Sequence, residues 1–226
     1  MATLQQSFFV RRHPDSVMAL ANARIGSCAL CGRQAAKAKM AAHLAACLAA
    51  HGGAERIQAL VLSRFEAAYD SRYWLYAEAR ANASLRHLDA FLRKIWLECC
   101  GHLSAFYADH QQLGMGAVAN LVFGARGAKI RYEYDFGSTT TLTGQAVSVH
   151  HGAKGREVVR LLARNAPLEE PCTQCAEPAT VVCPYCLEGG AALLCATHAG
   201  THEHADEGVY LPVINSPRMG VCGYIG

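Results

Sequence analysis

Apolar residues recur at helical spacing in three segments of the chain. Met40, Leu44 and Leu48 lie four residues apart in an alanine-rich stretch, which predicts a helix that ends at a pair of glycines. Apolar side chains also recur every three or four positions over residues 54–69 and 85–97. We therefore expect two further helices there, each with one apolar face.

Other segments have the alternation, or the aromatic and β-branched content, that is typical of strands. In residues 130–136 (IRYEYDF), the apolar and aromatic side chains are expected on one face, and Arg131, Glu133 and Asp135 on the other. Further strands are expected at residues 73–79, 102–108, 139–149, 158–163 and 209–214. The chain therefore mixes helices and strands along its length.

A dense series of cysteines and histidines near the C-terminus is the strongest chemical signal. The eight residues, spaced C-x2-C-x7-C-x2-C-x8-C-x2-H-x3-H-x-H, are Cys172, Cys175, Cys183, Cys186, Cys195, His198, His202 and His204. Eight ligands are the number that two tetrahedral zinc sites need. Because all eight come from protein, neither site keeps the open position of a catalytic zinc, so structural zinc is expected.

Two pairings of these ligands are possible. In a sequential pairing, the first four cysteines bind one ion, and Cys195 binds the other with three histidines. In a crossed pairing, one ion takes the first and third couples of ligands and the other takes the second and fourth. We favour the crossed pairing, because the loop between the first two C-x2-C pairs is short for one site and a one-cysteine, three-histidine site is less usual.

A third zinc site is expected near the N-terminus, which brings the expected number of zinc ions to three. Its ligands, spaced C-x2-C-x11-H-x3-C, are Cys28, Cys31, His43 and Cys47. His43 and Cys47 are four residues apart on a predicted helix, so their side chains share one face. His51, one turn further on, is an alternative fourth ligand. The large aromatic residue that usually precedes the helix of such a finger is missing.

The charge of the chain is small but unevenly distributed. The net charge is +3, whereas residues 1–60 hold seven basic residues and only two acidic ones. Arg33, Lys37 and Lys39 lie at the start of the finger helix, where such fingers often contact phosphates or bases. Arg11, Arg12 and Arg24 precede the finger. This distribution indicates an anionic partner such as nucleic acid, with an ordinary solvated surface as an equal alternative.

The cysteines indicate a reducing compartment. A secreted disulfide framework would not need histidines between its cysteines, and the first residues lack the apolar run of a signal peptide. No stretch approaches the roughly 18 apolar residues of a membrane span. A cytoplasmic protein is therefore expected.

Two further groups of residues are candidates for catalysis. Cys99, Cys100 and His102 are close in sequence, and a nearby imidazole can activate a thiol. Asp135 with Glu133 could form an acid pair. Cysteines after an apolar helix are more often buried as small hydrophobic residues, and solvated acids on a strand are common. Cys222 in the C-terminal tail is expected to contact the core.

Residues 73–165 resemble a known family. The segments YWLYAEA, SLRHLDAFLRKIW, GHLSAF, YEYDFGSTT and VVRLLARNAP occur in the order found in the plasmid pRiA open-reading-frame-three-like family, which is also described as a passenger protein of a mycobacterial insertion element. The resemblance implies an α+β fold with an antiparallel sheet and packed helices. The motif positions carried over are His102, Tyr134, Asp135 and Gly137, whereas Ser138 replaces an acidic residue that is frequent in the family.

The spacing of the C-terminal ligands resembles the B-box class of cross-braced zinc modules. Modules of that class mostly bind proteins and are not catalytic. We expect residues 1–69 to form a helical region with a zinc finger at 28–47, and 70–167 to form the α+β domain. Residues 168–208 would form a double-zinc module, followed by a strand and tail at 209–226.

The expected function is that of a non-enzymatic, zinc-binding adaptor or regulatory protein that contacts protein, nucleic acid or both. One alternative is nucleic-acid binding through the basic finger. The other is a thiol or acid–base enzyme around Cys99, His102 and Asp135.

Overall fold

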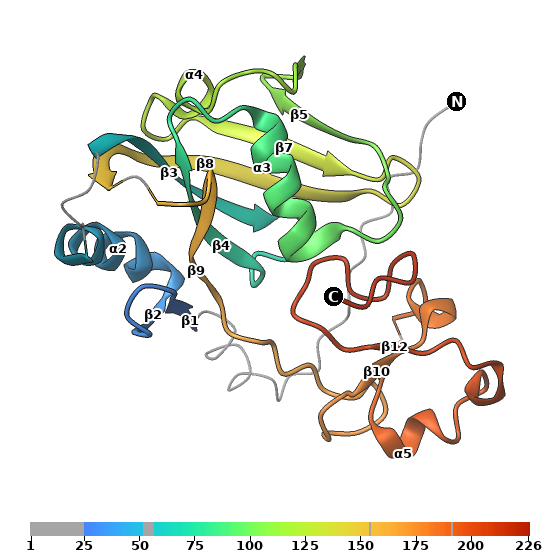
Figure 1. Cartoon of the computed structure of the whole chain (residues 1–226). Helices are drawn as coiled ribbons and strands as arrows, with labels where there is room; N and C mark the ends of the chain where they lie inside the picture. The colour runs from blue at the N-terminus through green and yellow to red at the C-terminus, as the bar shows by residue number, and fades with distance from the viewer. Residues whose placement is uncertain (1–24, 52–56, 154, 191) are drawn as a thin grey trace.

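The computed structural model describes residues 25–51, 57–153, 155–190 and 192–226 (Figure 1). Its main feature is an antiparallel sheet in the order β2-β1-β9-β4-β3-β8-β7-β5-β6. These strands are β1 (Ile25–Cys28), β2 (Gln34–Ala36), β3 (Ile57–Ala67), β4 (Trp74–Arg80), β5 (Ser104–Ala108), β6 (Gln111–Leu113), β7 (Lys129–Tyr134), β8 (Thr140–Ala153) and β9 (Val159–Asn165). The expected α+β class with a large antiparallel sheet is confirmed.

Helices pack on both faces of this sheet and create two hydrophobic cores. The helical elements are α2 (Lys37–His51), α3 (Leu85–Leu92), a π-helical turn η1 (Arg93–Leu97) that continues α3, and the short α4 (Ala119–Phe123). On β4, Trp74 and Tyr76 pack with α2, whereas Leu75 and Ala77 pack in the core that includes α3 and α4. Figure 1 shows α3 lying across the sheet. Because β4 is buried on both faces, its first four residues are all apolar or aromatic (WLYA).

The expected helix over residues 54–69 is wrong, because the described part of this segment, from residue 57 onward, forms the central strand β3. The strand is paired on both sides, with β4 and β8. Val61 and Phe65 pack in the core on one face of the sheet, and Leu62 packs in the core on the other. Because both faces of β3 are covered, apolar residues occur on both, and their spacing resembles a helical period.

The predicted alternation of buried and exposed side chains over residues 130–136 holds up to Tyr134, where strand β7 ends. Ile130, Tyr132 and Tyr134 are buried, as expected. The chain then leaves the sheet, and Asp135 takes a φ of 64°. As a result, Phe136 is exposed and Asp135 is buried, the reverse of what strict alternation predicts.

The N-terminal finger is part of the main sheet. Strand β1 pairs with β9, with Gly26 opposite Asn165, and β3 pairs with β4 across the expected boundary at residues 69 and 70. That boundary therefore falls in the turn of a hairpin. The sheet places the finger, its helix α2 and the α+β body in one structural unit.

The C-terminal residues form a smaller sheet and then return to the body. Its elements are β10 (Val181–Val182), η2 (Pro184–Cys186), β11 (Leu193–Leu194), α5 (Ala196–Ala199), η3 (Ala205–Glu207) and β12 (Leu211–Pro212). After β12, Asn215 accepts a hydrogen bond from Asn165, and the Ser216 hydroxyl donates to the Trp96 carbonyl at 2.6 Å. Among the described residues, no helix is long and apolar enough to cross a membrane.

Candidate metal centres

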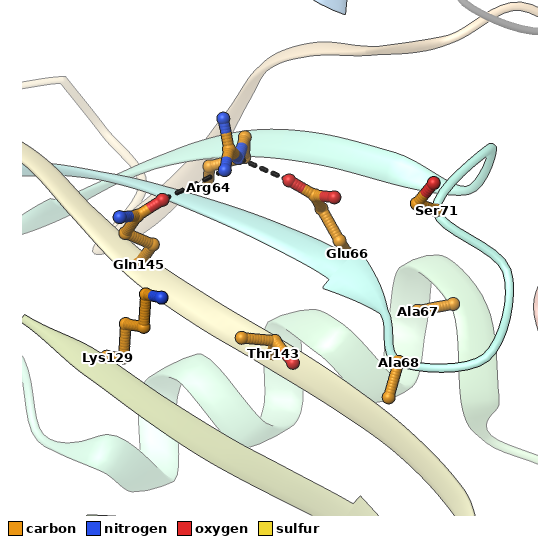
Figure 2. Close-up of a pocket in the computed structure, with 8 residues that line it drawn as sticks. All are labelled: Arg64, Glu66, Ala67, Ala68, Ser71, Lys129, Thr143 and Gln145. Carbon is orange, nitrogen blue, oxygen red and sulfur yellow. Dashed lines mark hydrogen bonds and ion pairs between the residues drawn. The ribbon is translucent and has the colours of Figure 1, made fainter. Parts of the chain in front are cut away.

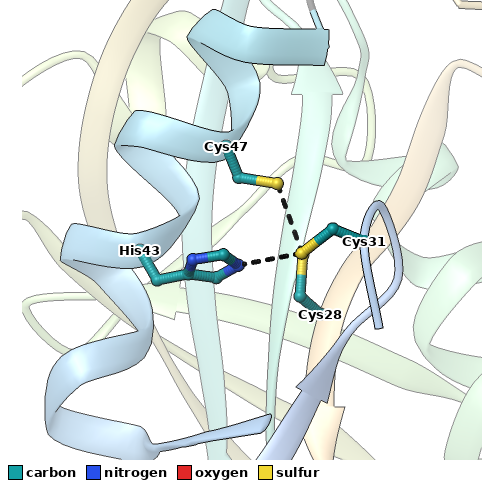
Figure 3. Close-up of side chains that lie close together, drawn as sticks. All are labelled: Cys28, Cys31, His43 and Cys47. Atoms are coloured by element: carbon teal, nitrogen blue, oxygen red, sulfur yellow. Dashed lines mark hydrogen bonds between the residues drawn. The ribbon is translucent and has the colours of Figure 1, made fainter. Parts of the chain in front are cut away.

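The N-terminal ligands come together between β1 and α2. Figure 3 shows the side chains of Cys28, Cys31, His43 and Cys47 facing a common centre. Cys28 ends β1, and Cys31 lies in the turn before β2, where Gly32 has a φ of 74°. The sulfurs of Cys28 and Cys47 are 3.9 Å apart, and Cys31 Sγ lies 3.4 Å from His43 Nε2.

His51 is not part of this group of four. Its Nδ1 lies 2.9 Å from the carbonyl oxygen of Cys47, the residue one turn earlier on α2. The missing aromatic residue of the finger is replaced by the sheet. Trp74 and Tyr76 of β4 pack with Met40 and Leu44 of α2 in one core. The ligands of this cluster are thus held by a core that the finger shares with the sheet.

The eight C-terminal cysteines and histidines form two groups of four. One group is Cys172, Cys175, Cys195 and His198, and the other is Cys183, Cys186, His202 and His204. This is the crossed grouping, in which each cluster takes ligands from both halves of the segment. Within each of these clusters, the possible ligand atoms lie within 4.8 Å of one another. Each could hold a metal ion.

The thiols in these clusters do not ionise independently. Burial opposes the ionisation of Cys172, but backbone N–H groups of Cys195 and Gln174 and the side chain of His198 lower its pKa to about 6. Burial and the neighbouring Cys183 thiol raise the pKa of Cys186 to about 11. Several thiolates in one place repel each other, and a bound cation removes that penalty. The arrangement therefore favours a cation at each centre.

The basic residues of the finger have different environments. Lys37, the first residue of α2, forms an ion pair with Glu66 at 2.9 Å and donates to the Ser71 carbonyl. Arg33 and Lys39 are exposed. Arg11, Arg12 and Arg24 lie outside the described residues.

A shallow polar groove lies next to the Lys37 contact (Figure 2). Its lining residues are Arg64, Glu66, Ala67, Ala68, Ser71, Lys129, Thr143 and Gln145. Arg64 donates to Gln145 at 2.9 Å and pairs with Glu66. These contacts engage the side chains of Arg64, Glu66 and Gln145 with one another.

The residues considered for catalysis form a further cluster with Cys222. Cys99, Cys100, His102 and Cys222 place their ligand atoms within 4.8 Å of one another. The described residues thus contain four clusters able to hold a metal ion, whereas the sequence predicted three. Sequence reasoning missed this cluster because 120 residues separate His102 from Cys222. The available signal was that Cys99, Cys100 and Cys222 remain after the spaced motifs are assigned.

Asp135 does not pair with Glu133 as an acid dyad. Its carboxylate binds the guanidinium of Arg218, a residue of the tail that is fully buried. It also accepts a hydrogen bond from the backbone N–H of Gly137 at 3.0 Å. Burial alone would raise the pKa of Asp135, but the Arg218 hydrogen bonds lower it below its usual value. The ion pair with Arg218 therefore favours the ionised form of Asp135.

Comparison with known proteins leaves the family undetermined. No protein-family model matches the chain, and no curated protein matches it. Among solved structures, the chain is similar to MM3350, a protein of unknown function from Methanosarcina mazei Go1. The match has a TM-score of 0.42 and 13% sequence identity, and it covers 47% of this chain and 69% of that one. The family resemblances drawn from the sequence stay predictions.

Proposed function

We propose that this protein is a zinc-binding adaptor without catalytic activity, and that it acts by binding another protein. The observation that carries the proposal is the closed ligand set of each spaced motif. Every cluster offers four protein donors, whereas a catalytic zinc keeps one position for water or substrate. Metal in such sites holds surfaces in place.

Zinc is the ion that best fits the donor atoms and their spacing. A tetrahedral zinc site has edges of about 3.8 Å between sulfurs, about 3.5 Å between sulfur and nitrogen, and about 3.3 Å between nitrogens. The Cys175–Cys195 sulfurs are 3.8 Å apart, and Cys183 Sγ lies 3.5 Å from His204 Nδ1. His202 Nε2 and His204 Nδ1 are 3.3 Å apart. Thiolate ligands also fit a reducing compartment such as the cytoplasm.

Exposed apolar side chains near the tail support a protein partner. Leu103 is 73% exposed, Phe136 is 52% exposed and Ile225 is 67% exposed. Leu103 and Phe136 lie on adjacent segments, because the Leu103 carbonyl accepts a hydrogen bond from the Asp135 N–H. Exposed apolar side chains on adjacent segments favour protein contacts over solvent. Nucleic-acid binding through the finger has less support, since Lys37 is engaged with Glu66 and Ser71.

Two measurements on the full chain test this function. The first is the metal content of the purified protein, measured by inductively coupled plasma mass spectrometry, where zinc is expected. The second is cross-linking of the protein in native lysate, followed by identification of the captured proteins. A double variant, Leu103→Asp with Phe136→Asp, should lose a specific cross-linked partner. Leu121→Asp is the matched control, because Leu121 is 83% exposed but lies on α4.

The outcomes separate the candidate functions. A protein without bound zinc, or a partner retained equally by all variants, would contradict the proposal. Salt-sensitive binding to mixed DNA or RNA that Arg33→Ala with Lys39→Ala abolishes would instead establish the nucleic-acid function.

A further inference from the structure

The cluster of Cys99, Cys100, His102 and Cys222 joins two distant parts of the chain. The first three residues lie between η1 and β5, whereas Cys222 belongs to the C-terminal tail. Cys222 Sγ lies 3.4 Å from Cys100 Sγ and 3.2 Å from His102 Nε2. The sulfur–nitrogen separation is close to the 3.3–3.6 Å of the other clusters, whereas the sulfur–sulfur separation is shorter than the 3.8–3.9 Å found there.

The distribution of all the cysteines among the clusters also favours a metal site here. The chain has eleven cysteines. Three of the clusters contain three cysteines each and the fourth contains two, so every cysteine of the chain belongs to a cluster of four possible ligands. The cysteines outside the spaced motifs, Cys99, Cys100 and Cys222, are therefore grouped with other possible metal ligands just as the cysteines inside the motifs are. Three thiols and one imidazole are a common donor set for structural zinc.

The surroundings of His102 support a role as a metal ligand. Its Nε2 faces Cys222, and its other nitrogen, Nδ1, faces the Asp135 carboxylate at 3.5 Å. Histidines that bind metal usually direct their second nitrogen to a carboxylate or a carbonyl, which fixes the ring orientation. Asp135 is itself held by Arg218 from the tail. The tail thus supplies both a possible ligand and the residue that positions the supporting carboxylate.

Both segments that form the cluster contain a residue with a positive φ angle. Cys222 has a φ of 52°, a conformation that is uncommon for a residue other than glycine. On the other side, Gly101 has a φ of 73°, directly between Cys100 and His102. The π-helical turn η1, which precedes Cys99, is also a rare conformation that is frequent at functional sites. The strained conformation of Cys222 persists where surrounding contacts hold it.

We propose that Cys99, Cys100, His102 and Cys222 bind a fourth zinc ion, which fastens the C-terminal tail to the α+β body. The proposal shares with the proposed function the assumption that the chain binds zinc. It does not depend on adaptor activity. Its consequence is that metal adds a further attachment of the tail, beside the Arg218–Asp135 ion pair and the Ser216–Trp96 hydrogen bond.

Two other chemistries would use the same atoms differently. The first is a catalytic triad, in which Cys222 would be the nucleophile, His102 the base and Asp135 the acid that orients the base. Such a triad would require a reactive Cys222. Alternatively, Cys100 and Cys222 could form a disulfide bond. Two observations favour a metal site over a nucleophile: Cys100 lies close to Cys222, and Cys99 adds a third thiol. A nucleophilic cysteine needs no further thiol beside it.

The test is the zinc content of the full chain and of four variants. The wild-type protein should hold four zinc ions per chain, and Cys222→Ser should hold three. His102→Ala, on the opposite side of the junction, should also hold three. The double variant should still hold three, because both residues serve one ion. Val221→Ala is the control for packing of the tail and should keep four.

Alkylation with iodoacetamide, read by mass spectrometry, adds a second measurement. Cys222 is exposed, yet in the zinc-loaded protein it should resist alkylation and become reactive after the zinc is chelated. Retention of four ions by Cys222→Ser, or three ions in the wild type with a freely reactive Cys222, would overturn the fourth site and leave the proposed function standing. A Cys100–Cys222 disulfide in the native protein would also overturn it. Absence of all zinc would contradict both proposals.

Discussion

Gly26 of β1 lies directly against the backbone of β9 and the ring of Trp74. A Cβ atom at this position would lie 2.2 Å from the Arg164 carbonyl oxygen and 2.5 Å from the ring of Trp74. The first neighbour is backbone and the second is a fully buried side chain, so neither can move easily. Glycine is therefore required for β1 to pair with β9 beneath Trp74.

We expect Gly26→Ala to destabilise the protein by about 1–3 kcal/mol, the usual cost of forcing an extra methyl group into a packed site. The free energy of unfolding in urea, measured with zinc present, checks this expectation. Gly116→Ala is the matched control, since nothing lies within 4 Å of its added Cβ, and its effect should stay within about 0.5 kcal/mol. Equal stability of the two variants would contradict the close approach.

At the scale of elements, helix α2 depends on both the metal ligands and the sheet. Its buried residues are Met40, Leu44 and Cys47, and the first two pack with Trp74 in the core on that face. The chain has two tryptophans, and the second, Trp96, lies in the core on the opposite face. Each tryptophan therefore reports on one face of the sheet.

We expect Cys47→Ser to shift the fluorescence of Trp74 to longer wavelength, because α2 would loosen and admit water to its core. The measurement uses a Trp96→Phe background, in which Trp74 is the single emitter. In a Trp74→Phe background, the same Cys47→Ser change should leave the emission of Trp96 unaltered. An equal shift of both tryptophans would show that the two faces do not respond separately to the N-terminal site.

At the scale of the whole molecule, the C-terminal module depends on metal more than the sheet does. Of the described residues in 172–190 and 192–204, none belongs to either hydrophobic core. Its sheet consists of three strands of two residues each. The crossed grouping makes each cluster join both halves of this segment. Such a small unit gains its stability mainly from metal binding.

Chelation should therefore raise amide hydrogen exchange over residues 172–204 before it affects strands β3, β4 and β8. The expected cause is the loss of metal binding energy, on the order of 10–16 kcal/mol for a structural zinc, which exceeds what the small core supplies. Hydrogen exchange with mass spectrometry, at increasing chelator concentration, measures the order. If these residues kept their protection after the metal had left, the module would not depend on its ions.

The sequence by itself determined the features that arise from local geometry. The paired ligands of the three spaced motifs, the helix over 85–97 and the strand around Tyr132 can be recognised because their residues lie within a few turns or strand steps of each other. The tertiary structure alone decided that β3 is a strand, that Asp135 turns inward to Arg218 and that Cys222 meets His102. Each of these depends on contacts between residues far apart in the chain: two neighbouring strands, a buried ion pair and a tail that returns to the body. The spacing of residues along the chain does not show which distant segments will meet. Bringing them together costs chain entropy, and only the contacts of the complete fold offset that cost.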